Sequence, residues 1–158
     1  MAASVNKAGG GKASSKAGKP EKFSAEEREA MKEALKDKRR AKTKTSPEED
    51  MATCLAAIDA MEPHDKALAL HIHRIVGEVA PQLAPRTFYG MPAYYLNGNN
   101  VCFFQSGAKF KTRYSTLGFS QAAQLDNGEI WPSAYAILEF TPQVEQQVRQ
   151  LIAKAASA

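Results

Sequence analysis

The sequence is poor in residues that build covalent or metal-dependent sites. It has two cysteines, Cys54 and Cys102, which stand 48 positions apart and form no C-x-x-C pair. This usage fits buried small side chains in a reducing compartment better than a disulfide framework. No metal-ligand cluster, phosphate-binding loop or nucleophile and base pair stands at a recognised spacing. The residues alone therefore assign no chemistry, and they favour a binding protein over an enzyme.

Long apolar runs are also missing. The N-terminus has lysines but no apolar core of the length that a signal peptide needs. No later run approaches the about 18 apolar residues of a membrane span. The sequence therefore predicts a soluble cytoplasmic protein without membrane association.

The basic charge is concentrated in the first part of the chain. Residues 1–45 carry 13 Lys or Arg against 6 Asp or Glu, and residues 46–158 carry 8 against 11. The net charges are +7 and −3, so the two parts are interpreted separately. Residues 1–23 are mostly Ala, Gly, Ser and Lys, a composition that predicts a disordered basic tail.

The tail suggests one function of its own. Its lysines alternate with small residues as in flexible basic arms, at Lys7, Lys12, Lys16, Lys19 and Lys22. Such an arm predicts weak contact with nucleic acid that is directed at phosphates and independent of sequence. The rest of the chain is acidic and has no RNP-like aromatic motif, so base-specific recognition is not expected.

A charged helix and linker are predicted for residues 24–45. Ser24 and Glu27 form a capping box, and acids precede bases along the segment, as the helix dipole prefers. Only Met31 and Leu35 offer an apolar side. We therefore expect a solvated helix that is loosely attached to the domain.

The folded domain is predicted to occupy residues 46–158. Ser46-Pro47-Glu48-Glu49 begins one helix, a second runs from about 64 to 80, and Thr141-Pro142 begins a closing helix. Nine of the thirteen aromatic residues lie between Phe88 and Phe119, where glycines mark turns. We predict four strands, at Phe88–Leu96, Val101–Gln105, Phe110–Phe119 and Ile130–Phe140. A short polar helix is predicted before the last strand, at Gln121–Leu125.

Short turns join these strands, so the sheet should be antiparallel. The predicted fold class is α+β, with a sheet of about four strands and with the helical hairpin and the C-terminal helix packed on one face. Pro132 inside the last strand indicates an edge or a bulge.

The segment Tyr89-Gly90-Met91-Pro92-Ala93-Tyr94 resembles the YdhG-like family, a small domain largely of unknown function. The resemblance covers about residues 50–155, including the helical hairpin, the Asn97-Gly98 turn and the apolar strand after it. The Lys-rich N-terminal extension and the later Trp131-Pro132 resemble one branch of that family. Some members are described as frataxin-like iron chaperones, so the resemblance implies iron as a cofactor and a partner protein that accepts it.

Two stretches are candidate binding elements. In the first, Gly90-Met91-Pro92 would open the ladder inside a strand, as either a ligand notch or a structural bulge. In the second, the cations of the third predicted strand would form either a binding surface for a small anionic or planar ligand or a solvated outer face. The candidate ligand-binding residues are Tyr89, Gly90, Met91, Pro92, Tyr94, Lys109, Lys111, Arg113 and Trp131.

Metal binding has weaker support. His64 and His71 share a helix stripe at a two-turn spacing that is too long for one tight site, so solvated or core-edge histidines are favoured. An iron-chaperone role would use acids that otherwise complement helix dipoles and solubilise the surface: Glu48, Glu49, Asp50, Asp59, Glu62 and Asp65.

Overall fold

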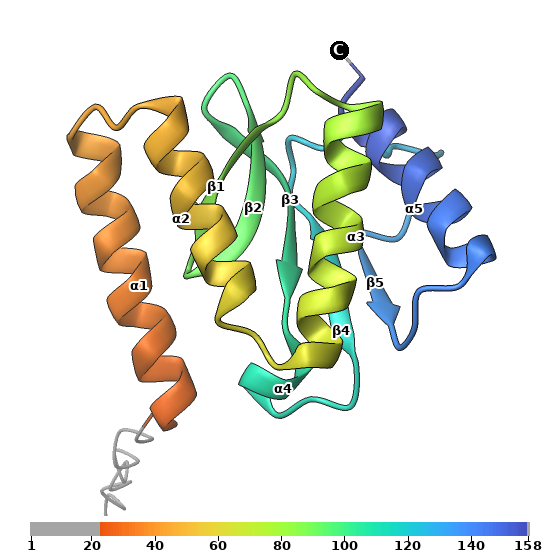
Figure 1. Ribbon diagram of the computed structural model, residues 1–158. Helices are drawn as coiled ribbons and strands as arrows, with labels where there is room; N and C mark the ends of the chain where they lie inside the picture. The colour runs from red at the N-terminus through yellow and green to blue at the C-terminus, as the bar shows by residue number, and fades with distance from the viewer. Residues whose placement is uncertain (1–22, 158) are drawn as a thin grey trace, which may run out of the picture.

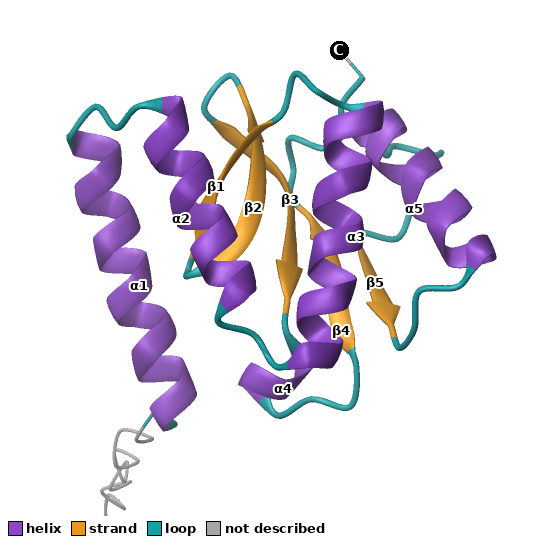
Figure 2. Ribbon diagram, in the orientation of Figure 1, coloured by secondary structure: helices purple, strands orange, loops and turns teal. Residues whose placement is uncertain are grey.

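An antiparallel sheet with the strand order β1-β2-β3-β4-β5 forms the centre of the fold. In the computed structural model, which describes residues 23–157, α2, α3 and α5 cover one face of this sheet (Figures 1 and 2). The strands are β1 (Ala84–Phe88), β2 (Met91–Leu96), β3 (Asn99–Gln105), β4 (Ser115–Phe119) and β5 (Ala134–Ile137). The helices are α1 (Ala25–Lys42), α2 (Pro47–Asp59), α3 (Pro63–Val79), the short α4 (Gly107–Phe110) and α5 (Pro142–Ala155). The predicted α+β class is confirmed, and the predicted disordered tail lies outside the described residues.

The helix starts follow the capping signals in the sequence. Ser24 and Ser46 each form a complete capping box, and the hydroxyl of Thr141 accepts a hydrogen bond from Val144. These three predicted N-termini are confirmed. None of the helices that the structure describes is long and apolar enough to cross a membrane.

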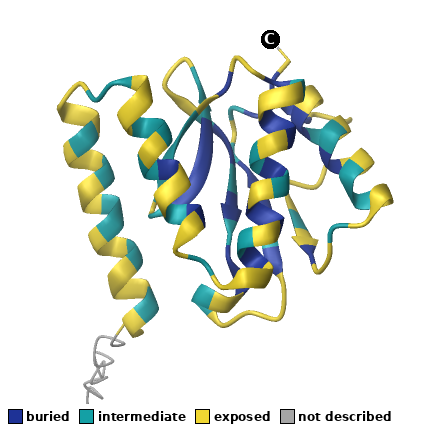
Figure 3. Cartoon of the chain, in the orientation of Figure 1, coloured by how far each residue is buried: buried dark blue, intermediate teal, exposed yellow. Residues whose placement is uncertain are grey.

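The core lies between the sheet and the three helices that cover it (Figure 3). Tyr94, Cys102 and Phe104 point from the sheet toward these helices and are at most 1% exposed. Cys54 on α2 is equally buried, and burial raises the pKa of the Cys54 thiol to about 11 and that of Cys102 to about 12. Both cysteines are therefore inert thiols in the core, as predicted.

The first hairpin differs from the prediction. Tyr89 and Gly90 have φ angles of 50° and 75°, so they form a two-residue turn of the kind that joins hairpin strands. The predicted strand Phe88–Leu96 is therefore wrong, because the chain reverses at this turn and β1 precedes it. The predicted ligand notch inside a strand is wrong for the same reason, because Gly90 belongs to the turn. Pro92 pairs with Thr87, one position beyond the Phe88–Met91 pair that flanks the turn. Because pairs in an antiparallel ladder alternate between hydrogen-bonded and non-hydrogen-bonded, the missing N–H of Pro92 removes no bond to β1.

Tyr89 occupies a conformation that favours glycine and asparagine. A bulky side chain in the left-handed region costs about 1 kcal/mol. Tyr89→Asn should therefore leave the free energy of unfolding unchanged or raise it by up to about 1 kcal/mol. Urea denaturation of the two proteins measures this difference, and a clear loss of stability would show that the Tyr89 ring contributes more than its backbone costs.

The prediction of a cationic third strand at Phe110–Phe119 is also wrong. Residues 107–110 form α4, Lys111 has a φ of 54°, and β4 begins only at Ser115. The three cations therefore belong to a helical turn and the loop after it. They do not share a strand face.

The last predicted strand is shorter than expected. Gln121–Leu125 forms no helix, so the only short helix among the described residues precedes β4. β5 spans four residues at the edge of the sheet. β5 is an edge strand, as predicted, but Pro132 lies in the loop before it and not inside the strand.

Candidate ligand-binding site

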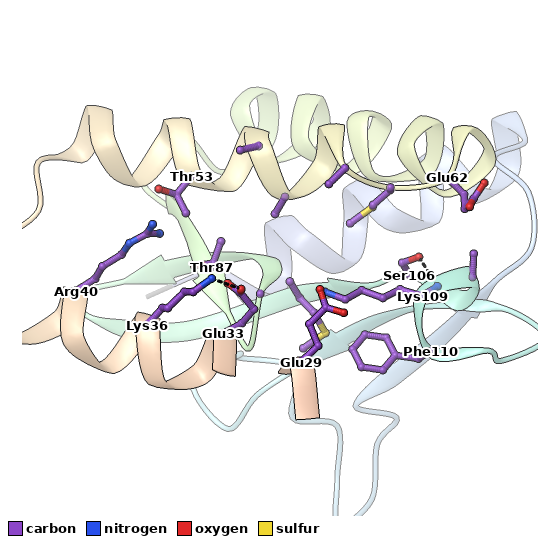
Figure 4. Close-up of a pocket in the computed structure, with 17 residues that line it drawn as sticks. Glu29, Glu33, Lys36, Arg40, Thr53, Glu62, Thr87, Ser106, Lys109 and Phe110 are labelled. Carbon is purple, nitrogen blue, oxygen red and sulfur yellow. Dashed lines mark hydrogen bonds and ion pairs between the residues drawn. The ribbon is translucent and has the colours of Figure 1, made fainter. Parts of the chain in front are cut away.

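A cavity of about 490 Å³ lies between α1 and α2, and residues of the β1–β2 hairpin and of α4 also line it (Figure 4). The two helices face each other with side chains that do not interlock. Every third or fourth residue of α1 on this side is charged, at Glu29, Glu33, Lys36 and Arg40. The facing residues of α2 and its C-cap are small, at Thr53, Ala56, Ala57 and the C-cap Ala60. Because neither stripe supplies apolar side chains of matching size, the space between the helices stays open.

Polar contacts hold α1 beside the domain. Asp37 accepts a 2.5 Å hydrogen bond from the Thr87 hydroxyl and a 3.5 Å bond from the Gly90 N–H. Near the start of α1, Glu26 forms a 2.6 Å ion pair with Lys111, which lowers the pKa of the Glu26 carboxyl. No residue of α1 is buried, as expected for a solvated helix. The helix nevertheless docks, at the edge of the sheet beside β1.

Gly90 brings the β1–β2 turn against α1. A Cβ at this position would lie 2.8 Å from Cγ of Glu33, so only glycine allows this approach. The position of this added Cβ also lies 3.6 Å from Nζ of Lys109, which extends from α4 into the cavity. Glu33 pairs with Lys36 at 2.7 Å. Among residues 23–157, Arg40 and Lys109 have no carboxylate partner within 4.0 Å, so the cavity contains two cations free to bind an anion.

A buried carboxylate sets the position of α4 and therefore of Lys109. Asp65, on α3, is 5% exposed and accepts hydrogen bonds from the Ser106 hydroxyl at 2.6 Å, the Ala108 N–H at 2.9 Å and the Ser115 hydroxyl at 3.1 Å. Burial raises the pKa of Asp65, but these hydrogen bonds outweigh it and the net pKa is lowered. The ionised carboxylate thus fixes both ends of the segment that carries Lys109.

The cavity unites some of the predicted site residues. Gly90, Met91 and Lys109 line it. Pro92 and Tyr94 are buried on the helix-covered side of the sheet, and the Tyr94 hydroxyl lies 3.0 Å from Nδ1 of His73, so neither side chain reaches the cavity.

The other four predicted residues lie elsewhere, at Tyr89, Lys111, Arg113 and Trp131. The Tyr89 ring packs on Phe88, and the Lys111 ammonium pairs with Glu26. The Arg113 guanidinium lies over the Tyr114 ring and lines a second groove, of about 630 Å³, between β5 and α5. Trp131 precedes β5 in a loop. The structure therefore does not assemble the predicted combination of cations with Tyr89, Tyr94 and Trp131.

Most of the candidate metal ligands contact protein partners. Nε2 of His64 lies 2.8 Å from the Leu138 carbonyl, and the His71 ring stacks on Phe140. Two of the named acids form ion pairs, Asp50 with Arg86 and Asp59 with Lys66. Within residues 23–157, no three His, Cys, Asp or Glu side chains come together in a group that would hold a metal ion.

Sequence reasoning missed the α1 stripe, and it named Asp65 only as a candidate metal ligand, not as the residue that holds α4. The spacing of Glu29, Glu33, Lys36 and Arg40 marks one face of a helix, but nothing local shows what that face meets. No protein-family model, curated protein or solved structure matches this chain. The resemblance to the YdhG-like family therefore stays a prediction.

Proposed function

We propose that this domain is a non-enzymatic binding protein for a small anionic ligand, which it holds in the cavity between α1 and α2. The observation that carries the proposal is the mismatch between the charged stripe of α1 and the small residues of α2. It leaves about 490 Å³ open beside cations that have no carboxylate partner among the described residues. Small-molecule sites commonly have volumes of about 300 to 1,000 Å³ and a few placed polar groups.

The lining indicates how a ligand would be held. Lys109 reaches in from α4 and Arg40 from α1, so an anionic ligand would bridge the helix to the domain. Phe110 lies beside Lys109 at the rim, with the ammonium 5.8 Å from the ring centroid, and offers a face to a planar group. The small side chains of Ala56 and Ala57 leave room for the ligand on the α2 side.

Iron binding remains a separate prediction that rests on the family resemblance. An iron chaperone would need carboxylates or histidines that converge. The acids near the cavity, Glu29, Glu33 and Glu62, belong to no metal-ligand group among the residues that the structure describes. The cavity proposal does not depend on iron.

Lys109→Met tests the proposal. Inorganic phosphate, succinate and benzoate serve as probes, and stabilisation by any of them is measured as a rise in melting temperature. For a probe that binds, Lys109→Met should weaken the affinity about tenfold, because it removes one charge-assisted contact.

Lys32→Met is the matched control, since Lys32 is an exposed lysine of α1 that does not line the cavity. It should bind the probe as wild type does. Equal weakening by both substitutions would indicate general charge attraction, and unchanged binding by Lys109→Met would contradict the proposed site.

A further inference from the structure

The sheet face turned away from the helices carries no carboxylate in its central rows. Strand pairing places Arg86, Ala93, Phe103, Gly118 and Ala134 in one row across all five strands. Phe103 lies between Cys102 and Phe104, which point into the core, so its row faces the other way. The neighbouring row on this face contains Gln105, Thr116 and Ala136.

Three aromatic side chains form a continuous patch on this face, here called the aromatic platform: Phe88, Tyr89 and Phe103. The Phe88 centroid lies 5.5 Å from that of Phe103 and 4.6 Å from that of Tyr89. The Tyr89 side chain is 44% exposed, and the two phenylalanines are partly exposed. None of the three belongs to the core cluster or packs against it. The platform is therefore an aromatic surface that faces solvent.

Gly118 allows the Phe103 ring to lie against the sheet. A Cβ on Gly118 would come within 2.3 Å of the ring, so a larger residue would displace it. The ring is thereby held over the backbone. A fixed, partly exposed ring of this kind suits stacking of a flat ligand group.

The most basic part of the sequence includes α1, which docks at the same edge of the sheet. α1 docks beside β1 through Asp37, which bonds to Thr87 and Gly90, the neighbours of Phe88 and Tyr89. Residues 1–45, which include α1, have a net charge of +7. The last turn of α1 is basic, with Arg39, Arg40 and Lys42. A partner of the platform should therefore combine a polyanionic backbone with flat, uncharged groups.

We propose that the aromatic platform binds single-stranded nucleic acid, with bases stacked on Tyr89 and Phe103 and with phosphates attracted by the positive charge of residues 1–45. Single strands expose the faces of their bases, whereas a duplex keeps them stacked inside. Stacking tolerates any base, so this binding needs no base-specific motif. The binding is sequence-independent and falls with salt concentration.

The test uses full-length protein and fluorescein-labelled oligonucleotides, a single-stranded dT 15-mer and a duplex of the same length, with fluorescence anisotropy at low salt. The single strand should bind more tightly than the duplex. Tyr89→Asn should weaken binding of the single strand about tenfold, the scale of one lost base stack. It is the informative variant because asparagine suits the turn and the fold is kept. Tyr114→Asn is the matched control, since Tyr114 is 38% exposed but lines the groove beside α5.

A second full-length variant separates the platform from the basic tail. It replaces five lysines by glutamine, at Lys7, Lys12, Lys16, Lys19 and Lys22, and it should lower the dependence of affinity on salt while the effect of Tyr89→Asn persists. If Tyr89→Asn binds like wild type while the glutamine variant loses binding, the tail alone is responsible and the platform proposal is overturned. Equal affinity for duplex and single strand, or no binding of either, overturns it as well.

Discussion

Gly107→Ala should destabilise the domain by about 3 kcal/mol, the upper part of the range for an overpacked interior position. A Cβ at this buried glycine would lie 2.6 Å from the carbonyl oxygen of Tyr114 and 2.8 Å from its carbonyl carbon. Both are backbone atoms, so no side-chain rotation relieves the contact. The loop between α4 and β4 would have to move, and Lys109 with it. Urea denaturation gives the change in the free energy of unfolding.

The matched control is Gly77→Ala. Gly77 lies within α3, and no heavy atom lies within 4 Å of the position of its added Cβ. Alanine there should stabilise the protein by about 0.5 to 1 kcal/mol, because glycine loses more backbone entropy in a helix. The two substitutions are chemically identical and should change stability in opposite directions. Similar results for both would show that the α4 segment is less closely packed than the structure indicates.

Asp65→Ala should also cost about 3 kcal/mol, because it leaves two buried hydroxyls and one N–H without their acceptor. These donors belong to Ser106, Ser115 and Ala108. Asp59→Ala is the control, since that carboxylate is solvent-exposed and pairs only with Lys66, and it should change stability little. Thermal and urea unfolding of both variants measure the difference. A small effect at Asp65 would show that α4 does not depend on this carboxylate.

The contribution of Asp65 should depend on pH in one direction. Its pKa in the folded protein is lowered relative to an unfolded aspartate, whose pKa is about 3.9. The stabilisation is therefore fully present above about pH 4 and is lost as the pH falls through the folded pKa. The stability gap between wild type and Asp65→Ala should narrow below about pH 4. A gap that is constant down to acid pH would assign the effect to packing alone.

Local chemistry predicted the elements whose ends are defined by neighbouring residues. Ser24, Ser46 and Thr141 mark their helices because a capping hydroxyl acts on residues within the next turn. The Asn97-Gly98 turn was predictable for the same reason, since both residues tolerate their φ angles of 50° and 80°. Tyr89 at a φ of 50° has no such signal, so β1 was missed.

Distant contacts determined what the sequence did not show. Residues 110–117 alternate in polarity like a strand. Asp65, more than 40 positions earlier, accepts hydrogen bonds from Ser106 and Ala108 and stabilises a helical turn there instead. The docking of α1 likewise depends on Asp37 and Thr87, which are 50 positions apart. Of the candidate site, Gly90, Met91 and Lys109 were named from the sequence. The face of α1 that completes the cavity follows only from its docking.

Native mass spectrometry of the protein purified from its own cells tests the central claim, that the cavity between α1 and α2 holds a small ligand. Wild type is compared with two variants of α2, Ala57→Leu, which extends a larger side chain into the cavity, and Ala52→Leu, which adds the same side chain at an exposed position outside it. Leucine is well tolerated in helices, so both variants should fold. We predict a discrete bound mass on wild type and on Ala52→Leu that is absent from Ala57→Leu. The same bound mass on all three proteins, or on none of them, would contradict the claim.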